Sequence, residues 1–191
     1  RQMCIRDSSY YAMPLAVTLR SVLENLSGRQ KIALFILDGG IRPARKRKIL
    51  RSLISNHEVE TTWITPPATQ LARVPTSDTY PISAYYRILL PDLIPKQLKK
   101  LIYLDADLVV TGDLEQLWKL DMGDYYALAV QDICHQYVSQ TSHLNRPEFG
   151  IPADQKYFNT GVLLIDLEKW RNHQITQKTL DFLETHSDCI R

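Results

Sequence analysis

The stretch Leu-Ile-Tyr-Leu-Asp-Ala-Asp-Leu-Val-Val, residues 101–110, places two carboxylates directly after a run of apolar residues. Such a run is typical of a buried strand in a parallel sheet. Asp105 and Asp107 would then leave the sheet at its carboxyl edge, where open α/β sheets bind their ligands. Two like charges so close repel each other, and a divalent cation removes that repulsion. Because carboxylate oxygens suit Mg²⁺ or Mn²⁺, the stretch predicts a metal site at the edge of a sheet.

Strands and helices alternate on both sides of this stretch. We expect further strands at residues 31–37, 59–64, 127–130 and 158–166. We expect helices at residues 14–25, 42–55, 83–90, where Pro91 would halt the helix, and 167–186. The alternation predicts an α/β fold with a mainly parallel central sheet flanked by helices.

Two further aspartates also follow apolar runs. Asp132 follows residues 127–130 after one intervening residue, Gln131, and we expect it at the same edge as Asp105 and Asp107. Asp38 begins an Asp-Gly-Gly sequence, which favours a turn residue over a metal ligand.

The first eight residues, Arg-Gln-Met-Cys-Ile-Arg-Asp-Ser, make a poor first strand because two arginines and an aspartate interrupt them. A helix follows at once, and a helix of an α/β sheet needs a preceding strand on which to pack. We therefore expect residues 1–8 to be partly foreign, with a divergent first strand as the alternative. The domain would span residues 9–191, and we expect it to be cut at both ends.

The composition is that of one globular domain: 191 residues, 45% hydrophobic and 23% charged. A formal net charge of +2 gives no electrostatic case for nucleic acid. Three cysteines without metal-site spacing argue against a disulfide framework and structural zinc, and favour a reducing, cytoplasmic setting. The basic cluster at residues 42–51 is either a solvated helix face or a contact for an anionic acceptor or the inner membrane surface.

Several segments, in the same order, resemble the glycosyltransferases of family 8, which include bacterial lipopolysaccharide galactosyl- and glucosyltransferases and the glycogenins. The segments are residues 14–23, 83–88, 103–110, 114–118 and 157–167, the last followed by Trp170 and Arg171. The resemblance implies a single nucleotide-sugar-binding domain of the GT-A, Rossmann-like type. It also implies a UDP-hexose donor and a Mn²⁺ or Mg²⁺ ion.

The resemblance further implies a role for each matching residue. Asp105 and Asp107 would bind the metal and the donor, and Tyr11 would stack on the uracil. Asp132 and Asn159 are the candidate catalytic residues, since Asp132 would bind sugar hydroxyls. The remaining donor-binding candidates are Arg87, which suits a sugar or a phosphate, and Asn159, Thr160 and Gly161, which would line the sugar pocket.

Each of these side chains also has a simpler interpretation. Tyr11 could only cover the sheet edge, and Arg87 could pair with Asp92 or another surface carboxylate. Asp132 could cap a turn, and Asn159 could only satisfy backbone groups in its own loop.

The sequence departs from the family pattern in two places. Ser8 stands where the family has an aspartate that contacts the base, and Asp7 comes one position too early. The family's third metal ligand, a histidine, and its later Asp-Gln-Asp segment do not occur in these 191 residues.

The resemblance implies transfer of a hexose, with retention, to a glycan or lipid-linked saccharide, as in lipopolysaccharide or other cell-surface glycan synthesis. Retaining hydrolases use a carboxylate nucleophile, and no residue here is an obvious one. Our hypothesis is therefore attack on the face from which the diphosphate leaves. Two alternatives stay open: a catalytically incomplete fragment that binds nucleotide sugars, and a haloacid-dehalogenase-type phosphatase, whose signature also fits residues 105–109.

Overall fold

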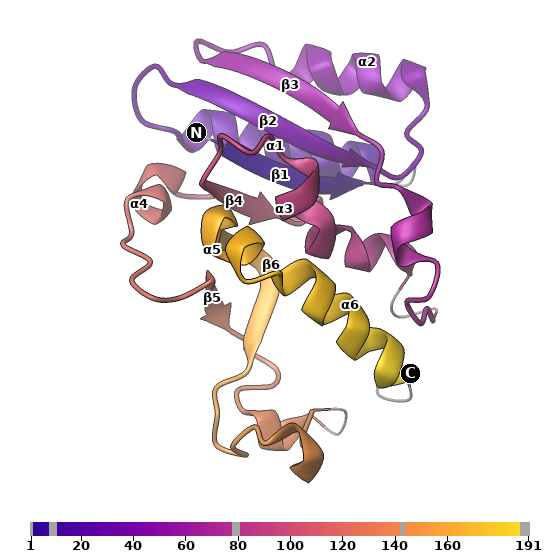
Figure 1. Cartoon of the computed structure of the whole chain (residues 1–191). Helices are drawn as coiled ribbons and strands as arrows, with labels where there is room; N and C mark the ends of the chain where they lie inside the picture. Colours follow the sequence, from indigo (N-terminus) through magenta and orange to yellow (C-terminus); the bar gives the residue numbers. More distant parts are fainter. Residues whose placement is uncertain (1, 8–10, 78–80, 142–143, 188–191) are drawn as a thin grey trace.

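The structure, a computed structural model, describes residues 2–7, 11–77, 81–141 and 144–187 (Figure 1). Its strands are β1 Gln2–Asp7, β2 Lys31–Asp38, β3 Glu58–Ile64, β4 Lys100–Leu104, β5 Ala127–Gln131 and β6 Phe158–Asp166. Its α-helices are α1 Ala12–Asn25, α2 Pro43–Ser52, α3 Leu90–Leu93, α4 Leu114–Trp118, α5 Leu167–Asn172 and α6 Ile175–Thr185. The 3₁₀ helices are η1 Ala68–Leu71, η2 Ile82–Leu89, η3 Val138–Gln140 and η4 Pro147–Phe149.

The strands form one six-stranded sheet in the order β3-β2-β1-β4-β6-β5. β3, β2, β1 and β4 run parallel to one another. β6 is antiparallel to both of its neighbours, β4 and β5, so the other strands of this sheet all run in one direction. The predicted α/β fold with a mainly parallel sheet is confirmed, and the reversal of β6 is the feature that the sequence did not predict.

Helices cover both faces of the sheet, with α1 behind it and α3 and α5 in front in the view of Figure 1. Alternate residues of β4 show why two layers form. Ile102 and Leu104 pack with α1, whereas Leu101 and Tyr103 pack with α3 and the start of α5. All four side chains are fully buried, which is what an unbroken apolar strand between two helical layers requires.

Residues 2–7 form β1 in the middle of the sheet, between β2 and β4, despite their unfavourable composition. Met3, whose side chain the structure describes, is 3% exposed and belongs to the core beneath α1. β1 pairs with a parallel strand on each side, and this pairing outweighs the weak intrinsic strand preference of residues 2–7. That residues 1–8 are partly foreign stays a prediction.

Two helix predictions need correction. The expected stop at Pro91 is wrong, because Pro91 lies in the first turn of α3, which continues directly from η2. Proline fits there since the first backbone N–H groups of a helix need no partner within it. The expected helix at 167–186 is divided into α5 and α6 at Gln174, which has a left-handed φ of 54°.

Asp38 ends β2 and holds the turn that leads to α2. Its Oδ1 accepts hydrogen bonds from the backbone N–H of Gly40 (2.9 Å) and Ile41 (2.7 Å), and its Oδ2 pairs with Lys46. Burial acts to raise the pKa of Asp38, but the bonds from Lys46 and the two N–H groups together lower it below its usual value. The interpretation of Asp38 as a turn residue is confirmed.

We expect Asp38→Asn to lower the free energy of unfolding at pH 7 by about 2 kcal/mol, since charge-assisted bonds are lost. The folded carboxyl has the lower pKa, so its contribution is present above the pKa of an unfolded aspartate and is lost as the pH falls below about 4. Thermal unfolding of both proteins from neutral to acid pH measures this. Asp124→Asn, at an exposed aspartate, is the matched control and should change nothing. A difference between Asp38→Asn and the parent that persists in acid would contradict the account.

Candidate active site

The reversal of β6 brings its first residues to the edge where β4 and β5 end. Leu104 of β4 pairs with Val162, and Val130 of β5 pairs with Asn159 across a bulge. The backbone N–H of Asp105 donates to the carbonyl of Gly161 at 2.8 Å. A parallel β6 would have placed this segment at the opposite edge. The Asn-Thr-Gly sequence thus lies beside the Asp-Ala-Asp motif because of strand direction.

The two oxygens of Asp105 have different surroundings. Oδ1 accepts hydrogen bonds from the Tyr103 hydroxyl at 2.6 Å and from a guanidinium N–H of Arg87 at 3.1 Å. The same guanidinium donates to the Thr160 carbonyl at 2.6 Å and lies 4.8 Å above the ring of Tyr103. Oδ2 makes no such bond within the described part of the chain and lies next to Gly161. Two hydrogen bonds therefore fix the Asp105 carboxylate through Oδ1, and Oδ2 is left without a hydrogen bond to the described residues.

Arg87 pairs with Asp105 in place of Asp92, so the simpler interpretation of this arginine as a partner of Asp92 is wrong. Its side chain is 17% exposed, and an ion pair at that depth is screened less than one on the surface. Tyr103 is fully buried, and no role was predicted for it from the sequence. Tyr103 lies two residues before Asp105, and alternate side chains along a strand share a face. This spacing is the sequence signal that could have indicated a role for Tyr103.

Because Gly161 has no side chain, the side chains of Asp105 and Asn159 can lie close to its backbone. A Cβ atom at this position would lie 3.0 Å from Asn159 Oδ1 and 3.3 Å from Asp105 Oδ2. Both distances are tighter than ordinary contacts. Glycine here keeps two polar side chains close to the backbone of β6.

Asp132 and Asn159 form a second hydrogen-bonded pair at this edge. Asp132 Oδ1 accepts from the backbone N–H of Cys134 (2.8 Å) and His135 (2.9 Å), and Oδ2 accepts from Asn159 Nδ2 at 3.2 Å. The N–H of His135 and the Asn159 amide lower the pKa of Asp132, so the carboxylate is ionised near neutral pH. Asn159 Oδ1 also accepts from the N–H of Gly161 at 2.8 Å. Asp132 does cap a turn and Asn159 does bind its own loop, while the two also contact each other.

Asp107 and Tyr11 make fewer contacts. Asp107 is exposed and makes no side-chain hydrogen bond or ion pair with the residues that the structure describes. Tyr11 is the N-cap residue of α1 and is 42% exposed, and its side chain makes no hydrogen bond with the described residues. The position of the missing family aspartate, Ser8, lies outside the described residues. The donor-binding roles of all these side chains stay predictions.

A stripe of polar residues on α1 holds the chain on both sides of Asp107. The buried Thr18 hydroxyl lies within hydrogen-bond distance of the carbonyls of Ala106 (2.9 Å) and Leu108 (2.7 Å) and accepts from the N–H of Leu108 at 3.0 Å. Ser21 and Asn25 bind the N–H and the carbonyl of Val110, each at 2.9 Å. Polar residues at positions 18, 21 and 25 share one helix face, which is the sequence signal that could have identified them.

The carboxylates fit part of a metal site. Asp105 Oδ2 and the Asp107 carboxylate are hard oxygen donors of the kind that Mg²⁺ and Mn²⁺ prefer. Among the described residues, no group of three His, Cys, Asp or Glu side chains could hold a metal ion. Two protein ligands would leave coordination positions for the oxygens of a bound diphosphate.

Comparison with known proteins identifies the family. The family model described as glycosyl transferase family 8 matches residues 3–190. The chain belongs to glycosyltransferase family 8. This decides against the haloacid-dehalogenase-type alternative, which left the Asn-Thr-Gly segment unexplained.

Similar family members are known in bacteria. General stress protein A of Bacillus subtilis is 32% identical over 186 residues, which cover 97% of this chain and 62% of that protein. A lipopolysaccharide 1,2-glucosyltransferase of Escherichia coli is 29% identical, covering 93% of this chain and 50% of its own length. The structure of the galactosyltransferase LgtC with donor and acceptor sugar analogues matches with a TM-score of 0.82 at 28% identity, over 100% of this chain and 66% of LgtC.

The fold is of the GT-A type, as in LgtC. The chain spans between half and two thirds of the length of these relatives. Within the described residues, no helix is both long enough and apolar enough to cross a membrane.

We expect Gly161→Ala to weaken binding of a UDP-sugar at least tenfold, since the methyl group would displace Asn159 or Asp105. Calorimetric titration with UDP-galactose and UDP-glucose in Mn²⁺ measures this. Gly112→Ala is the matched control, because a Cβ atom there meets nothing within 4 Å. Equal losses in the two variants, or none in Gly161→Ala, would contradict the proposed role of this contact.

We expect Tyr103→Phe to weaken Mn²⁺ binding in the presence of UDP by about tenfold, as is usual when a group that orients a metal ligand is lost. The ring beneath Arg87 is kept, while the hydroxyl bond to Asp105 is lost. Manganese paramagnetic resonance measures the free ion during titration. Tyr86→Phe, at a half-buried tyrosine on η2, should leave the affinity unchanged. An unchanged affinity in Tyr103→Phe would show that Asp105 does not depend on this bond.

Proposed function

We propose that this chain is the donor-binding part of a glycosyltransferase that moves a hexose from a UDP-hexose to an acceptor hydroxyl, with Mn²⁺ or Mg²⁺ and with retention. The observation that carries the proposal is the hydrogen bonding of the Asp105 carboxylate. Tyr103 and Arg87 hold Oδ1, while Oδ2 makes no hydrogen bond with the described residues and the carboxylate of Asp107, two residues further on, is exposed. Two carboxylates presented in this way suit a cation that carries a diphosphate. When bound, such an ion would neutralise charge on the departing diphosphate.

Arg87 has donors left for the substrate. A guanidinium carries five N–H groups, and here three of them donate to Ala84, Thr160 and Asp105. The other two donate to none of the residues that the structure describes, and they would suit a phosphate or sugar oxygen of the donor. Because its three bonds fix its orientation, the arginine would bind the donor without losing much side-chain freedom.

Asp132 and Asn159 would orient the hexose. An ionised carboxylate accepts strong hydrogen bonds from sugar hydroxyls, and the bonds from Cys134, His135 and Asn159 fix its direction. These same bonds disfavour Asp132 as a nucleophile, since its oxygens already accept three donors. We therefore propose attack on the face from which the diphosphate leaves, with a leaving phosphate oxygen taking the proton of the acceptor hydroxyl. A covalent glycosyl-aspartate trapped at Asp132 would contradict this proposal.

The acceptor we propose is a glycan or a lipid-linked saccharide at the cytoplasmic side of the cell envelope. Support comes from the Escherichia coli relative, which is a lipopolysaccharide 1,2-glucosyltransferase. A second candidate function is nucleotide-sugar binding without turnover. It is favoured by the two carboxylates, since among the described residues no third metal-binding side chain joins them.

Titration with UDP in Mn²⁺ and in EDTA tests the donor site directly. We expect metal-dependent binding that Asp107→Asn weakens at least tenfold, because an exposed ligand is lost while no internal contact is broken. Asp124→Asn, at an exposed aspartate before β5, is the matched control and should bind like the parent.

Release of UDP from UDP-hexoses separates the two candidate functions. Turnover supports the transferase, whereas tight binding without turnover supports the binding function. Binding that is insensitive to EDTA and to Asp107→Asn would overturn the proposed metal site and the metal-dependent transferase, and absence of binding would overturn both candidate functions.

A further inference from the structure

Helix α2 carries a strongly basic surface that the proposed donor site does not use. Residues 42–51 include six arginines and lysines, and no acidic residue occurs from Gly39 to His57. Lys46 turns inward to Asp38 and Trp63. The other five side chains are exposed and form what we call the basic face: Arg42, Arg45, Arg47, Lys48 and Arg51.

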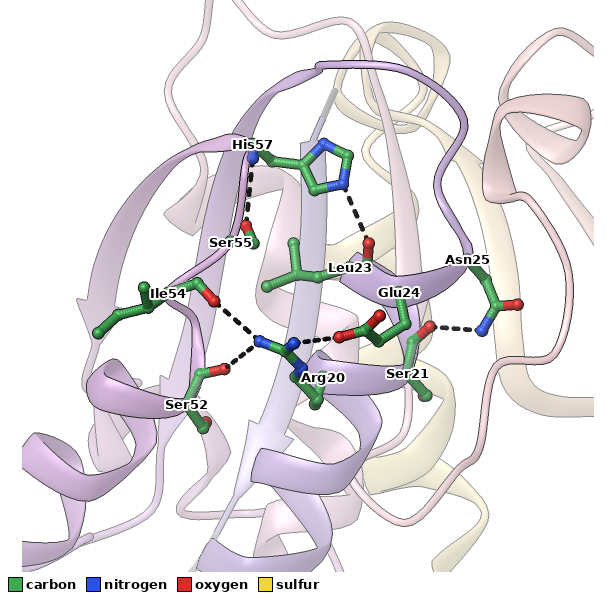
Figure 2. Close-up of polar contacts among 9 residues, drawn as sticks. All are labelled: Arg20, Ser21, Leu23, Glu24, Asn25, Ser52, Ile54, Ser55 and His57. Carbon is green, nitrogen blue, oxygen red and sulfur yellow. Dashed lines mark hydrogen bonds and ion pairs between the residues drawn. The ribbon is translucent and has the colours of Figure 1, made fainter.

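The segment that follows α2 is tied to α1 by polar contacts, as Figure 2 shows. Arg20 of α1 donates to the carbonyls of Ser52 (3.5 Å) and Ile54 (2.8 Å) at the end of α2 and pairs with Glu24. His57 binds the Leu23 carbonyl through Nε2 at 3.0 Å. These contacts hold the C-terminal end of α2 against α1.

Exposed apolar side chains flank the basic face on both sides. Ile54 is 77% exposed at the end of α2, and Leu50 is 42% exposed. On the other side, Met13 of α1 is 76% exposed at the mouth of a hollow of about 440 Å³ between the two helices. The hollow is lined by Ala12, Met13, Ala16, Arg45, Lys48 and Ile49, so cations stand beside apolar walls.

We propose that the basic face docks on the surface of an anionic phospholipid membrane. Phosphate headgroups complement the positive charge of the basic face, and the flanking Met13, Leu50 and Ile54 suit the boundary between headgroups and acyl chains. A soluble polyanion would match the charge alone and leave these apolar side chains in water. The combination favours lipid over nucleic acid or an acidic polymer.

Docking in this way would also place the sheet edge that carries Asp105 near the lipid. α1 and α2 begin after the carboxyl ends of β1 and β2, which lie at the same edge as the end of β4 and Asp105. If the proposed function holds, a lipid-linked acceptor would then meet the donor site without leaving the membrane surface. The docking itself does not depend on that function.

Vesicle flotation tests the proposal with the 191-residue chain. We expect binding to vesicles of phosphatidylglycerol and phosphatidylcholine in equal parts, and none to pure phosphatidylcholine. Each basic side chain near an anionic surface strengthens binding about fivefold, so joint replacement Arg47→Gln, Lys48→Gln and Arg51→Gln should weaken it about a hundredfold. These three side chains make no hydrogen bond or ion pair with the described residues, and thermal unfolding checks that the variant still folds.

Two matched variants separate lipid from general charge. Arg29→Gln, Lys96→Gln and Lys178→Gln together remove the same charge from other exposed positions and should leave vesicle binding unchanged. Ile54→Ser should weaken vesicle binding several-fold but leave binding to heparin, a soluble polyanion, as it is. Equal effects of the two triple variants would overturn the proposal. Tight heparin binding without vesicle binding would also overturn it and identify a soluble polyanion as the partner.

Discussion

The antiparallel insertion of β6 between β4 and β5 is the constraint on which the site depends. In a wholly parallel sheet the polar start of a strand lies at the edge opposite the polar ends of its neighbours. Here the reversed strand brings Asn159, Thr160 and Gly161 beside Asp105 and Asp132. The bond from the Asp105 N–H to the Gly161 carbonyl fixes the two segments directly. The bonds of Arg87 to Thr160 and of Asn159 to Asp132 depend on that pairing.

Two sets of hydrogen bonds, one from each helical layer, then fix the Asp-Ala-Asp motif in place. From the front layer, Tyr103 and Arg87 hold one oxygen of Asp105, so the orientation of the carboxylate is set before any ligand arrives. From the rear layer, Thr18 holds the backbone on both sides of Asp107, whose side chain stays exposed. A site organised before binding loses little conformational freedom when the ligand binds. Both sets come from residues that belong to the core of the domain.

Much of the fold can be predicted from the sequence, for physical reasons. The buried strands β2 and β4 are unbroken apolar runs, and the ends of such runs placed Asp38, Asp105 and Asp132 correctly at strand ends. Strand direction could not be predicted, because an apolar run has the same pattern whichever way it pairs. β1 could not be recognised either, since its neighbours supply its stability.

The contacts of the site were predictable only in part. The family resemblance indicated Arg87, Asn159 and Gly161, and the structure brings these residues together around Asp105. Tyr103 and Thr18 were missed, and for Thr18 the bond to the metal motif joins residues about 90 positions apart, so the polar face of α1 does not by itself indicate its partner. The stacking role of Tyr11, a half-exposed residue at the start of α1, stays a prediction.

The central claim is that Asp105 Oδ2 and Asp107 form one cation site at this edge. Crystals grown with UDP and Mn²⁺, measured at a wavelength where manganese scatters anomalously, test it most directly. The account predicts a manganese peak bound by both carboxylates, with the bonds from Tyr103 and Arg87 to Oδ1 intact. A manganese peak away from these two residues would contradict it, as would a metal bound through Oδ1 with those bonds broken.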